Sequence, residues 1–425
     1  MYMAQKSHIL RYMEKTKNAL LERFLRYVKT YTESSSEKAD AGIIPSSPEE
    51  AAFAEKLKDE LIKLGITDVT VTEHAYVCAR IPASAGMEDK PVTGFLAHMD
   101  TAEEVTGKNV NPNVIENYDG KAVQLKNGIT LEPGKDLHLA AAKGETIITT
   151  DGTTLLGADD KAGIAVIMTA AEILMNNPEI KHGAIEIIFS PDEETGHGTD
   201  FIPLNWMKSK HCYTLDGGHV GELETECFTA YKSEIDFTGV AMHTGTARPR
   251  MVNAVTMAAA FVNLLPQNES PEATDEYLGF YAPMKISGTI ENAQVVLFLR
   301  DFEMQKMQQR MDTVTALAKA MEYKFPGGKV NVTHTKQYLN MKNEMDKHPE
   351  VVEKLVKAAE AAGVKPVFRP IRGGTDGSRL SEMGIPTPNV FTGGHNFHSR
   401  TEWASLDQML IAVNTVVELI KQWAI

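Results

Sequence analysis

The alternation of buried, strand-like runs with helical segments constrains the fold of this chain more than any other feature of its sequence. Residues 92–97 and 184–190 are almost continuously apolar, as strands are when both faces of a sheet are covered. Residues 160–176, between them, form a helical segment with one apolar side. This order is typical of layered α/β folds, in which ligands bind beyond the carboxyl ends of the strands. We therefore predict a three-layer α/β/α domain with a mixed sheet.

The pattern changes at about residue 226. Strand-like and helix-like segments then alternate at 233–241, 253–265, 293–300, 303–323 and 329–337. A chain of 425 residues is too long for one ordinary core, so two domains are expected. We predict a discontinuous catalytic domain, 1–225 and 340–425, with a smaller α+β lid domain of βαβαβ type inserted at 226–339. The strand edges of the inserted domain would suit a homodimer. Residues 1–18 are expected to form a surface extension or a helical lead-in.

Charge and cysteine content exclude several classes of protein. The formal net charge of −14 argues against nucleic acid or an anionic membrane as the main partner. No apolar run reaches the roughly 18 residues that a membrane helix needs, and the N-terminal segment lacks the pattern of a secretory signal. Cys78, Cys212 and Cys227 are too few for a disulfide framework and form no CxxC motif. We expect a cytoplasmic protein with no nucleic-acid or membrane partner.

Potential metal ligands stand where strand-like runs give way to loops, or in Gly-rich turns. They are His98, Asp100, Asp159, Glu193, Glu194, Asp216 and His398. Two imidazoles and several carboxylates are the ligand types that two zinc-like ions need. Alternate residues leaving a strand point the same way, so Asp100 can accept a hydrogen bond from the ring of His98. If these side chains meet in space, the chain is a hydrolase.

Each of these motifs also has a purely structural explanation. Carboxylates such as Asp160 favour helix N-termini, and a solvated loop could hold the acids at 192–194. His395 competes with His398, and the residues alone do not decide between them. Further histidines that are more often found at surfaces than as ligands are His197, His211, His219 and His243.

Longer stretches of the chain resemble a known family. They are GKNVNPNVIENY, TIITTDGTTLLGADDKAGIA, PDEETGHG, TLDGGHVGELE, ESPEATDEYLGFY, PIRGGTDGSRLSEMGIPTPN and FTGGHNFHSRTEW. Together they resemble the di-zinc metallopeptidase superfamily of glutamate carboxypeptidases and aminoacylases, and most closely its peptidase T family of tripeptide aminopeptidases. The resemblance runs from about Ala19 to the C-terminal helix. It implies a zinc-dependent aminopeptidase that removes the N-terminal residue from tripeptides with free termini.

The resemblance also implies a role for each candidate. One zinc would be held by His98 and Asp216, and the other by Glu194 and His398, with Asp159 bridging both. Glu193 would be the general base, and Asp100 would orient His98. In the second domain, His243 would stabilise the oxyanion or contact the substrate. Arg372, in the RGGTDG motif, would bind a substrate carboxylate.

The sequence departs from the family pattern in two motifs, and residues 1–18 extend beyond the usual start. These departures concern substrate preference and lid contacts rather than ligands. The segment around the last ligand reads FHSRTE, and the one after His243 reads TGTARPR. Related di-zinc dipeptidases, carboxypeptidases and N-acyl amino acid deacylases are the alternatives within the superfamily. A non-catalytic peptide- or metal-binding protein on a peptidase fold is the alternative of a different class.

Overall fold

The chain forms two units, each with its own core, in the computed structural model, which describes residues 2–425 and the side chains of residues 13–425. The first unit extends to Thr225 and resumes with Glu344–Arg369 and Thr375–Ile425. The second consists of Glu226–Asn343 and Pro370–Gly374. The segment Pro370–Gly374, which contains Arg372, therefore belongs to the second unit. The boundaries expected from the sequence place it in the first.

The main sheet of the first unit is mixed. Its strands lie in the order β1 (Asp68–Val71), β2 (Val77–Ile81), β8 (Ile185–Ser190), β3 (Thr93–His98), β9 (Cys212–Gly217), β16 (Asn389–Phe391), β10 (Glu222–Glu224) and β15 (Val367–Phe368). The central strands β8, β3, β9 and β16 are parallel to one another, while β2 pairs antiparallel with β8 and β10 pairs antiparallel with β16. This arrangement confirms the mixed α/β sheet that the sequence predicts.

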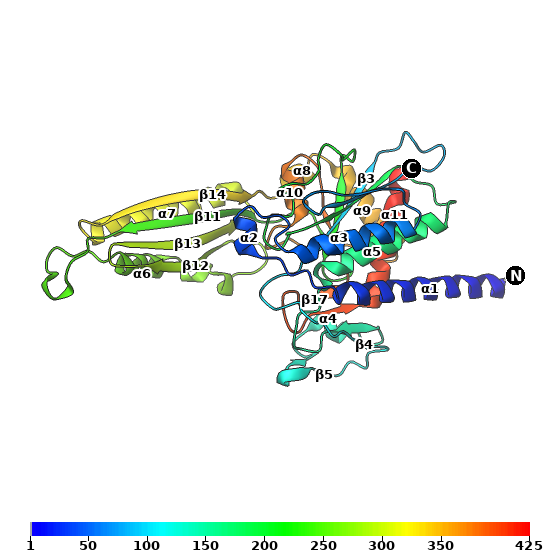
Figure 1. Cartoon of the computed structure of the whole chain (residues 1–425), viewed down its shortest axis with the longest axis horizontal. Helices are drawn as coiled ribbons and strands as arrows, with labels where there is room; N and C mark the ends of the chain where they lie inside the picture. Colours follow the sequence, from blue (N-terminus) through cyan, green and yellow to red (C-terminus); the bar gives the residue numbers. More distant parts are fainter. Residues whose placement is uncertain (1) are drawn as a thin grey trace. The chain divides into compact units, whose positions relative to one another are not determined.

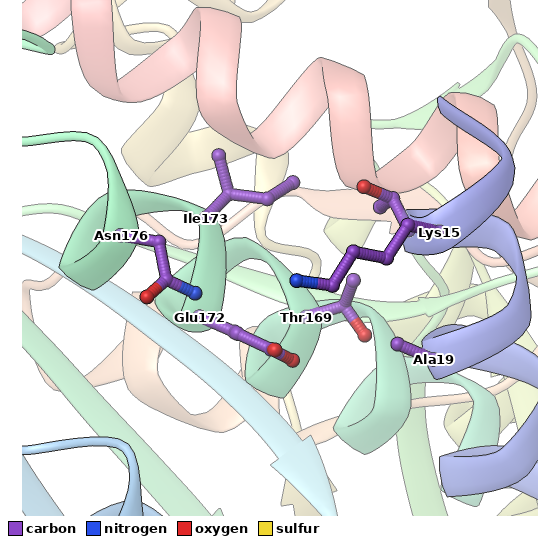
Figure 2. Close-up of a pocket in the computed structure, with 7 residues that line it drawn as sticks. Lys15, Ala19, Thr169, Glu172, Ile173 and Asn176 are labelled. Carbon is purple, nitrogen blue, oxygen red and sulfur yellow. The ribbon is translucent and has the colours of Figure 1, made fainter. Parts of the chain in front are cut away.

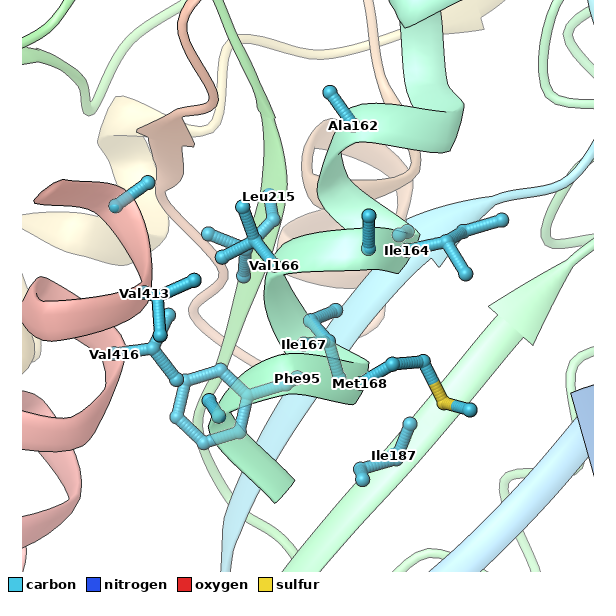
Figure 3. Packing of buried hydrophobic residues seen from close by; sticks show 14 of the residues in the cluster. Phe95, Ala162, Ile164, Val166, Ile167, Met168, Ile187, Leu215, Val413 and Val416 are labelled. Atoms are coloured by element: carbon cyan, nitrogen blue, oxygen red, sulfur yellow. The ribbon is translucent and has the colours of Figure 1, made fainter. Parts of the chain in front are cut away.

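Helices cover one face of this sheet. They are α1 (Tyr2–Val28), α3 (Pro48–Lys63), α5 (Ala158–Asn176), α9 (Pro349–Ala361) and α11 (Leu406–Ala424). Figure 3 shows α5 packed between the strands and α11, with Val166 and Ile167 among Phe95, Leu215 and Val413. Each such side chain contributes about 1.5–3 kcal/mol when it is fully buried.

The opposite face of the sheet is buried in a separate cluster. Strand side chains alternate, so Phe95 faces the α5 side, whereas its neighbour Leu96 joins Cys78, Ile188 and Leu380 on the other. Leu380 belongs to α10 (Asp376–Glu382), the helix on that side. Both faces of β3 and β8 are therefore buried, which explains why polar and apolar residues do not alternate along these strands.

Residues 101–156 form short elements around a small core of their own. They are β4 (Asn113–Ile115), β5 (Val123–Gln124), the 3₁₀ turn η1 (Lys126–Gly128), β6 (Thr130–Leu131), α4 (Leu137–Ala141) and β7 (Ile147–Thr149). A second sheet joins β4 and β7 to β18 (Trp403–Ser405) and β17 (Gly394–His395). Trp403 lies in the centre of this core, together with Tyr118 and Leu139. The sheet therefore connects the 101–156 segment to the loop that carries His398.

The second unit is an antiparallel sheet with helices on one face. The strands lie in the order β12 (Phe280–Gly288), β13 (Asn292–Asp301), β11 (Thr229–Thr238) and β14 (Lys329–Tyr338), and α6 (Ala254–Leu264) and α7 (Met304–Lys324) pack on them (Figure 1). The sequence did not predict β12, so the unit is βαββαβ rather than βαβαβ. β12 is an edge strand with Pro283 inside it, and an edge strand tolerates a proline that breaks the usual strand pattern.

The remaining elements are short. They are α2 (Ser36–Asp40), α8 (Lys342–Met345), and the 3₁₀ turns η2 (Thr244–Thr246), η3 (Gln267–Glu269) and η4 (Pro271–Ala273). Among the described residues, no helix is both long enough and apolar enough to cross a membrane.

Candidate metal centre

Neighbouring parallel strands bring four of the predicted ligands and acids to one edge of the sheet. His98 is the last residue of β3 and lies opposite Ser190, the last residue of β8. The pair Glu193 and Glu194 follows β8 after a short turn, and Asp216 lies near the end of β9. Because β8, β3 and β9 are parallel neighbours, their carboxyl ends meet at the same place.

The carboxylate of Asp159 lies between two imidazoles. Its Oδ1 is 2.8 Å from Nε2 of His98, and its Oδ2 is 3.2 Å from Nε2 of His398. His98 Nε2 is also 3.6 Å from Oδ1 of Asp216, and His398 Nε2 is 2.9 Å from Oε2 of Glu194. Each imidazole therefore faces Asp159 and one further carboxylate.

Asp100 fixes both the ring of His98 and the acidic turn after β8. Its Oδ1 is 3.2 Å from Nδ1 of His98 and accepts a hydrogen bond from the backbone N–H of Glu193 at 3.0 Å. Its Oδ2 accepts from the N–H of Glu194 at 3.1 Å. Asp100 is fully buried, so these bonds satisfy its carboxylate and hold His98 Nε2 towards Asp159.

Glu402 holds the turn that carries Asp159. Its buried carboxylate accepts hydrogen bonds from the backbone N–H groups of residues 156–159, at 2.6, 2.9, 2.7 and 3.2 Å. Gly157, inside this turn, has φ +81°, a conformation that glycine adopts without steric cost. The sequence reveals Glu402 only as the last residue of the H-x-x-x-E spacing from His398, so its structural role was missed.

Asp160 has a structural role, as the sequence suggested for an acid at a helix start. Its Oδ1 accepts from the N–H of Gly163 in the first turn of α5, at 3.2 Å. Its Oδ2 accepts from the backbone N–H of His98, at 3.1 Å. Asp160 therefore also joins the start of α5 to the end of β3, which the sequence did not predict.

The cluster carries more buried acid than its imidazoles can neutralise. Burial, together with Asp159, raises the pKa of Glu194 to about 8, and burial raises that of Asp216 to about 6. Burial and the nearby carboxylates raise the pKa of Glu193 well above its ordinary value. Against burial, hydrogen bonds from His398 and His98 keep the pKa of Asp159 below its ordinary value. Such a cluster favours bound cations, which displace protons from the ligands.

The donor set fits divalent metal ions. Two groups of side chains have potential ligand atoms within 4.8 Å of one another. The first group is His98, Asp159 and Glu194, and the second is His98, Asp160 and Asp216. Oε1 of Glu194 is buried and has no hydrogen-bond partner among the described residues, so it is free to act as a ligand. Nitrogen and carboxylate oxygen are the ligands that catalytic zinc sites use.

Three further candidate residues have partners of their own. His395 places its Nε2 3.2 Å from Oε1 of Gln408 instead. His243 belongs to the second unit, where its exposed ring accepts a hydrogen bond from the N–H of Gly245 at 3.2 Å. Arg372 also belongs to the second unit, where it donates to the carbonyl groups of Thr274, Glu276 and Leu278.

Asp376, in the RGGTDG motif, is a buried acid that was not predicted to belong to the site. Its carboxylate accepts a hydrogen bond from the hydroxyl of Ser190, at the end of β8. Burial raises the pKa of Asp376 to about 7. Its position, at the start of a helix directly after a Gly-rich turn, is the sequence feature that could have identified Asp376 as a candidate.

A pocket of about 260 Å³ elsewhere in the first unit lacks such chemistry. Figure 2 shows Lys15 and Ala19 of α1 opposite Thr169, Glu172 and Asn176 of α5. The carboxylate of Glu172 is already paired with Arg23 at 2.9 Å. The described residues that line this pocket therefore include no group of metal ligands.

Comparison with protein families identifies the chain. The model of peptidase family M20/M25/M40 matches residues 149–422, more than half of the chain. The chain belongs to this family. This M20 peptidase is similar to a protein named Peptidase T from Clostridium perfringens, at 45% identity over 403 residues, which cover 95% of this chain and 98% of that protein. The predicted family resemblance is therefore confirmed.

Solved structures show the same fold. Aminopeptidase PepT from Bacillus cereus superposes on the M20 peptidase with a TM-score of 0.73 at 24% identity, over 96% of this chain and 99% of that one. A dinuclear metal-binding peptidase of the M20 family from Bacillus subtilis gives 0.65 at 15% identity, over 96% and 98%. These likenesses confirm the predicted fold class of the M20 peptidase.

Proposed function

We propose that this M20 peptidase is an aminopeptidase that removes the N-terminal residue from tripeptides and uses two zinc ions. The observation that carries the proposal is the carboxylate of Asp159, whose two oxygens face different imidazoles, as those of a bridging ligand would. The 45% identity to a Peptidase T over nearly the whole chain supports the tripeptide substrate.

The residues divide naturally between two ions. His98 and Asp216 would hold one ion, Glu194 and His398 would hold the other, and Asp159 would contact both. Bound there, zinc would supply Lewis acidity, which makes a water molecule more acidic and polarises a carbonyl group.

Glu193 is the residue that we assign to proton transfer. It is not needed as a ligand in this division, and its backbone is anchored by Asp100 beside the ligand Glu194. Burial raises its pKa well above the ordinary value, which makes its carboxylate a stronger base. Glu193 would take a proton from the attacking water and return it to the leaving amine.

Charge contacts at the substrate ends would select short peptides. Arg372 remains our candidate for binding the substrate carboxylate, and His243 our candidate for the oxyanion. The guanidinium of Arg372 already bonds to carbonyl groups of residues 274, 276 and 278, so the loop at 274–278 would be part of the same recognition surface.

Cellular location and assembly stay proposals as well. Cys78 and Cys212 are buried free thiols, which supports a reducing compartment such as the cytoplasm. The edge strand β12, with Met284 and Ile286 exposed, supports a homodimer through the second unit.

Amino-acid release from di-, tri- and tetrapeptides with free and blocked termini tests the activity. We expect zinc-dependent cleavage of free tripeptides, and a loss of at least about 100-fold in kcat for Glu193→Gln, because proton transfer typically contributes that much. Glu179→Gln, an exposed acid on the surface, is the matched control and should retain full activity.

Other outcomes would change the assignment in defined ways. Cleavage of dipeptides or N-acyl amino acids instead of tripeptides would indicate a related di-zinc dipeptidase, carboxypeptidase or deacylase. Binding of two zinc ions without turnover of any substrate would indicate a non-catalytic binding protein, and full activity of Glu193→Gln would refute its role in proton transfer.

A further inference from the structure

Three histidines of the first unit converge away from Asp159. One ring nitrogen each of His138, His219 and His395 lies within 4.8 Å of the others. The ring centroid of His138 is 4.1 Å from that of His219 and 5.3 Å from that of His395. His138 lies on α4, His219 follows β9 and His395 lies on β17, so three separate segments supply the rings.

The cluster contains a buried ring nitrogen that is not hydrogen-bonded to any residue whose side chain is described. Nδ1 of His219 is buried and has no hydrogen-bond partner among the residues whose side chains are described. A buried polar atom without a partner costs free energy comparable to a lost hydrogen bond. A metal ion that accepted this lone pair would remove the cost.

The ring of His395 is oriented like that of a metal ligand. Its Nε2 lies 3.2 Å from Oε1 of Gln408, whose amide nitrogen donates to Oε2 of Glu145 at 3.1 Å. Because the amide oxygen of Gln408 faces the ring, Nε2 of His395 carries the hydrogen and Nδ1 keeps its lone pair. Stacking on Trp403, with ring centroids 4.0 Å apart, holds the ring in place. A hydrogen-bonded partner on the second ring nitrogen is the usual support of a ligating histidine.

The local charges favour a cation. Burial, followed by the proximity of His219, lowers the pKa of His395 to about 3. Burial and then His138 lower the pKa of His219. These rings are therefore neutral near pH 7, which is the form that binds metals. The carboxylate of Glu145 hydrogen-bonds to Gln408 and provides negative charge nearby.

We propose that His138, His219 and His395 bind one divalent transition-metal ion, such as Zn²⁺, at a site separate from the centre around Asp159. Three imidazole nitrogens suit zinc, nickel and copper better than magnesium or calcium. His138 is exposed, so the ion would enter from solvent and keep a position open for water.

The location gives this site a structural role. His219 lies three residues after Asp216, and His395 lies three residues before His398. An ion at the site would connect α4 to the end of β9, which carries Asp216, and to the segment that carries His398. The site does not depend on the substrate that we assign, because its ligands are not among the proposed catalytic residues.

Zinc content after equilibrium dialysis of the full-length protein against Zn²⁺ tests the proposal. We expect His138→Gln to retain one zinc ion per chain fewer than the wild type, and its exposed position means that the variant should still fold. His348→Gln, a matched histidine on the surface outside the cluster, should retain the wild-type content. The same comparison in an Asp159→Asn background assigns the lost ion to the histidine cluster rather than to the other centre.

Cobalt spectra give a readout that does not rely on activity. Addition of Co²⁺ should produce visible d–d bands in Asp159→Asn that weaken when His138 is also replaced by Gln. Equal zinc content in the wild type and His138→Gln would overturn the proposal, as would an equal loss in His348→Gln. Unchanged cobalt bands on replacing His138 would overturn it independently.

Discussion

At the scale of single residues, the position of Asp159 depends on a residue that would touch no metal. Glu402 accepts hydrogen bonds from four consecutive backbone N–H groups, and its carboxylate is fully buried. A helix cap satisfies one or two such groups. Glu402 therefore acts as the anchor of the entire turn before α5.

Replacing Glu402 by Gln should weaken both stability and metal binding. The amide has one acceptor oxygen where the carboxylate has two, and its N–H groups would face backbone N–H groups. We expect a loss of about 2–4 kcal/mol in the free energy of unfolding and a 10- to 100-fold weaker metal affinity. Chemical denaturation and zinc titration measure the two effects.

Glu418→Gln is the control for this variant. Glu418 lies on α11 and pairs only across the helix surface, with Lys421 at 2.7 Å, so its loss should cost about 0.5 kcal/mol or less. If Glu402→Gln were as stable and bound zinc as tightly as Glu418→Gln, the turn would not depend on this anchor.

The residue scale also shows what the sequence alone could not decide. His395 and His398 stand in one short loop, and only the fold directs one towards Asp159 and the other towards Gln408. The H-x-x-x-E spacing of the family, which ends here at Glu402, favoured His398 as the ligand. The residue types alone did not distinguish the two histidines. Hydrogen bonds to the backbone, such as those of Glu402, leave no sequence pattern beyond that spacing.

At the scale of elements, α5 packs closely against β9 at Gly163. A Cβ at Gly163 of α5 would overlap the carbonyl oxygen of Leu215 in β9 and would come within 2.5 Å of Oδ1 of Asp160. Asp159 starts α5 and Asp216 lies in β9, so this contact sets the distance between two proposed ligands.

Gly163→Ala should push α5 away from the sheet. We expect a loss of about 2–4 kcal/mol in the free energy of unfolding, because a backbone oxygen cannot move aside cheaply, together with weaker zinc binding. Gly134→Ala is the control: no atom lies within 4 Å of a Cβ there, so its effect should stay within about 0.5 kcal/mol. Thermal unfolding of both variants decides the matter, and equal melting temperatures would contradict the expectation.

Buried central strands were predictable, whereas edge elements were not. β3 and β8 are buried on both faces and mostly apolar, and therefore stand out in the sequence as nearly continuous apolar runs. β12 contains Pro283 and exposes most of its residues, and β5 and β6 span only two residues each. The sequence pattern of these strands therefore does not differ from that of a loop. Their pairing depends on neighbouring strands far along the chain.

At the scale of the whole molecule, a buried histidine links stability to pH. The ring of His211 stacks on Trp423 with centroids 3.6 Å apart, and its Nε2 is 3.1 Å from Oγ1 of Thr93. Burial lowers the pKa of His211 to about 3, against an ordinary value of 6.5. Between these values the unfolded chain binds a proton that the folded chain does not.

The free energy of unfolding should therefore fall as the pH drops below 6.5. This group alone contributes a slope of up to about 1.4 kcal/mol per pH unit, and none above pH 6.5, where the ring is neutral in both states. His211→Gln should be less stable at pH 7 and show a shallower slope below pH 6.5. Urea denaturation at a series of pH values measures both slopes, and parallel curves would contradict the assignment.

The order of the site residues along the chain has a consequence for biosynthesis. His98 and Asp159 precede the second unit, whereas His398 and Glu402 follow it. A growing chain therefore carries one imidazole of the pair and an unsupported Asp159 turn until translation has passed the whole of Glu226–Asn343. Translation thus delays assembly of the proposed hydrolytic centre until the inserted unit has been made.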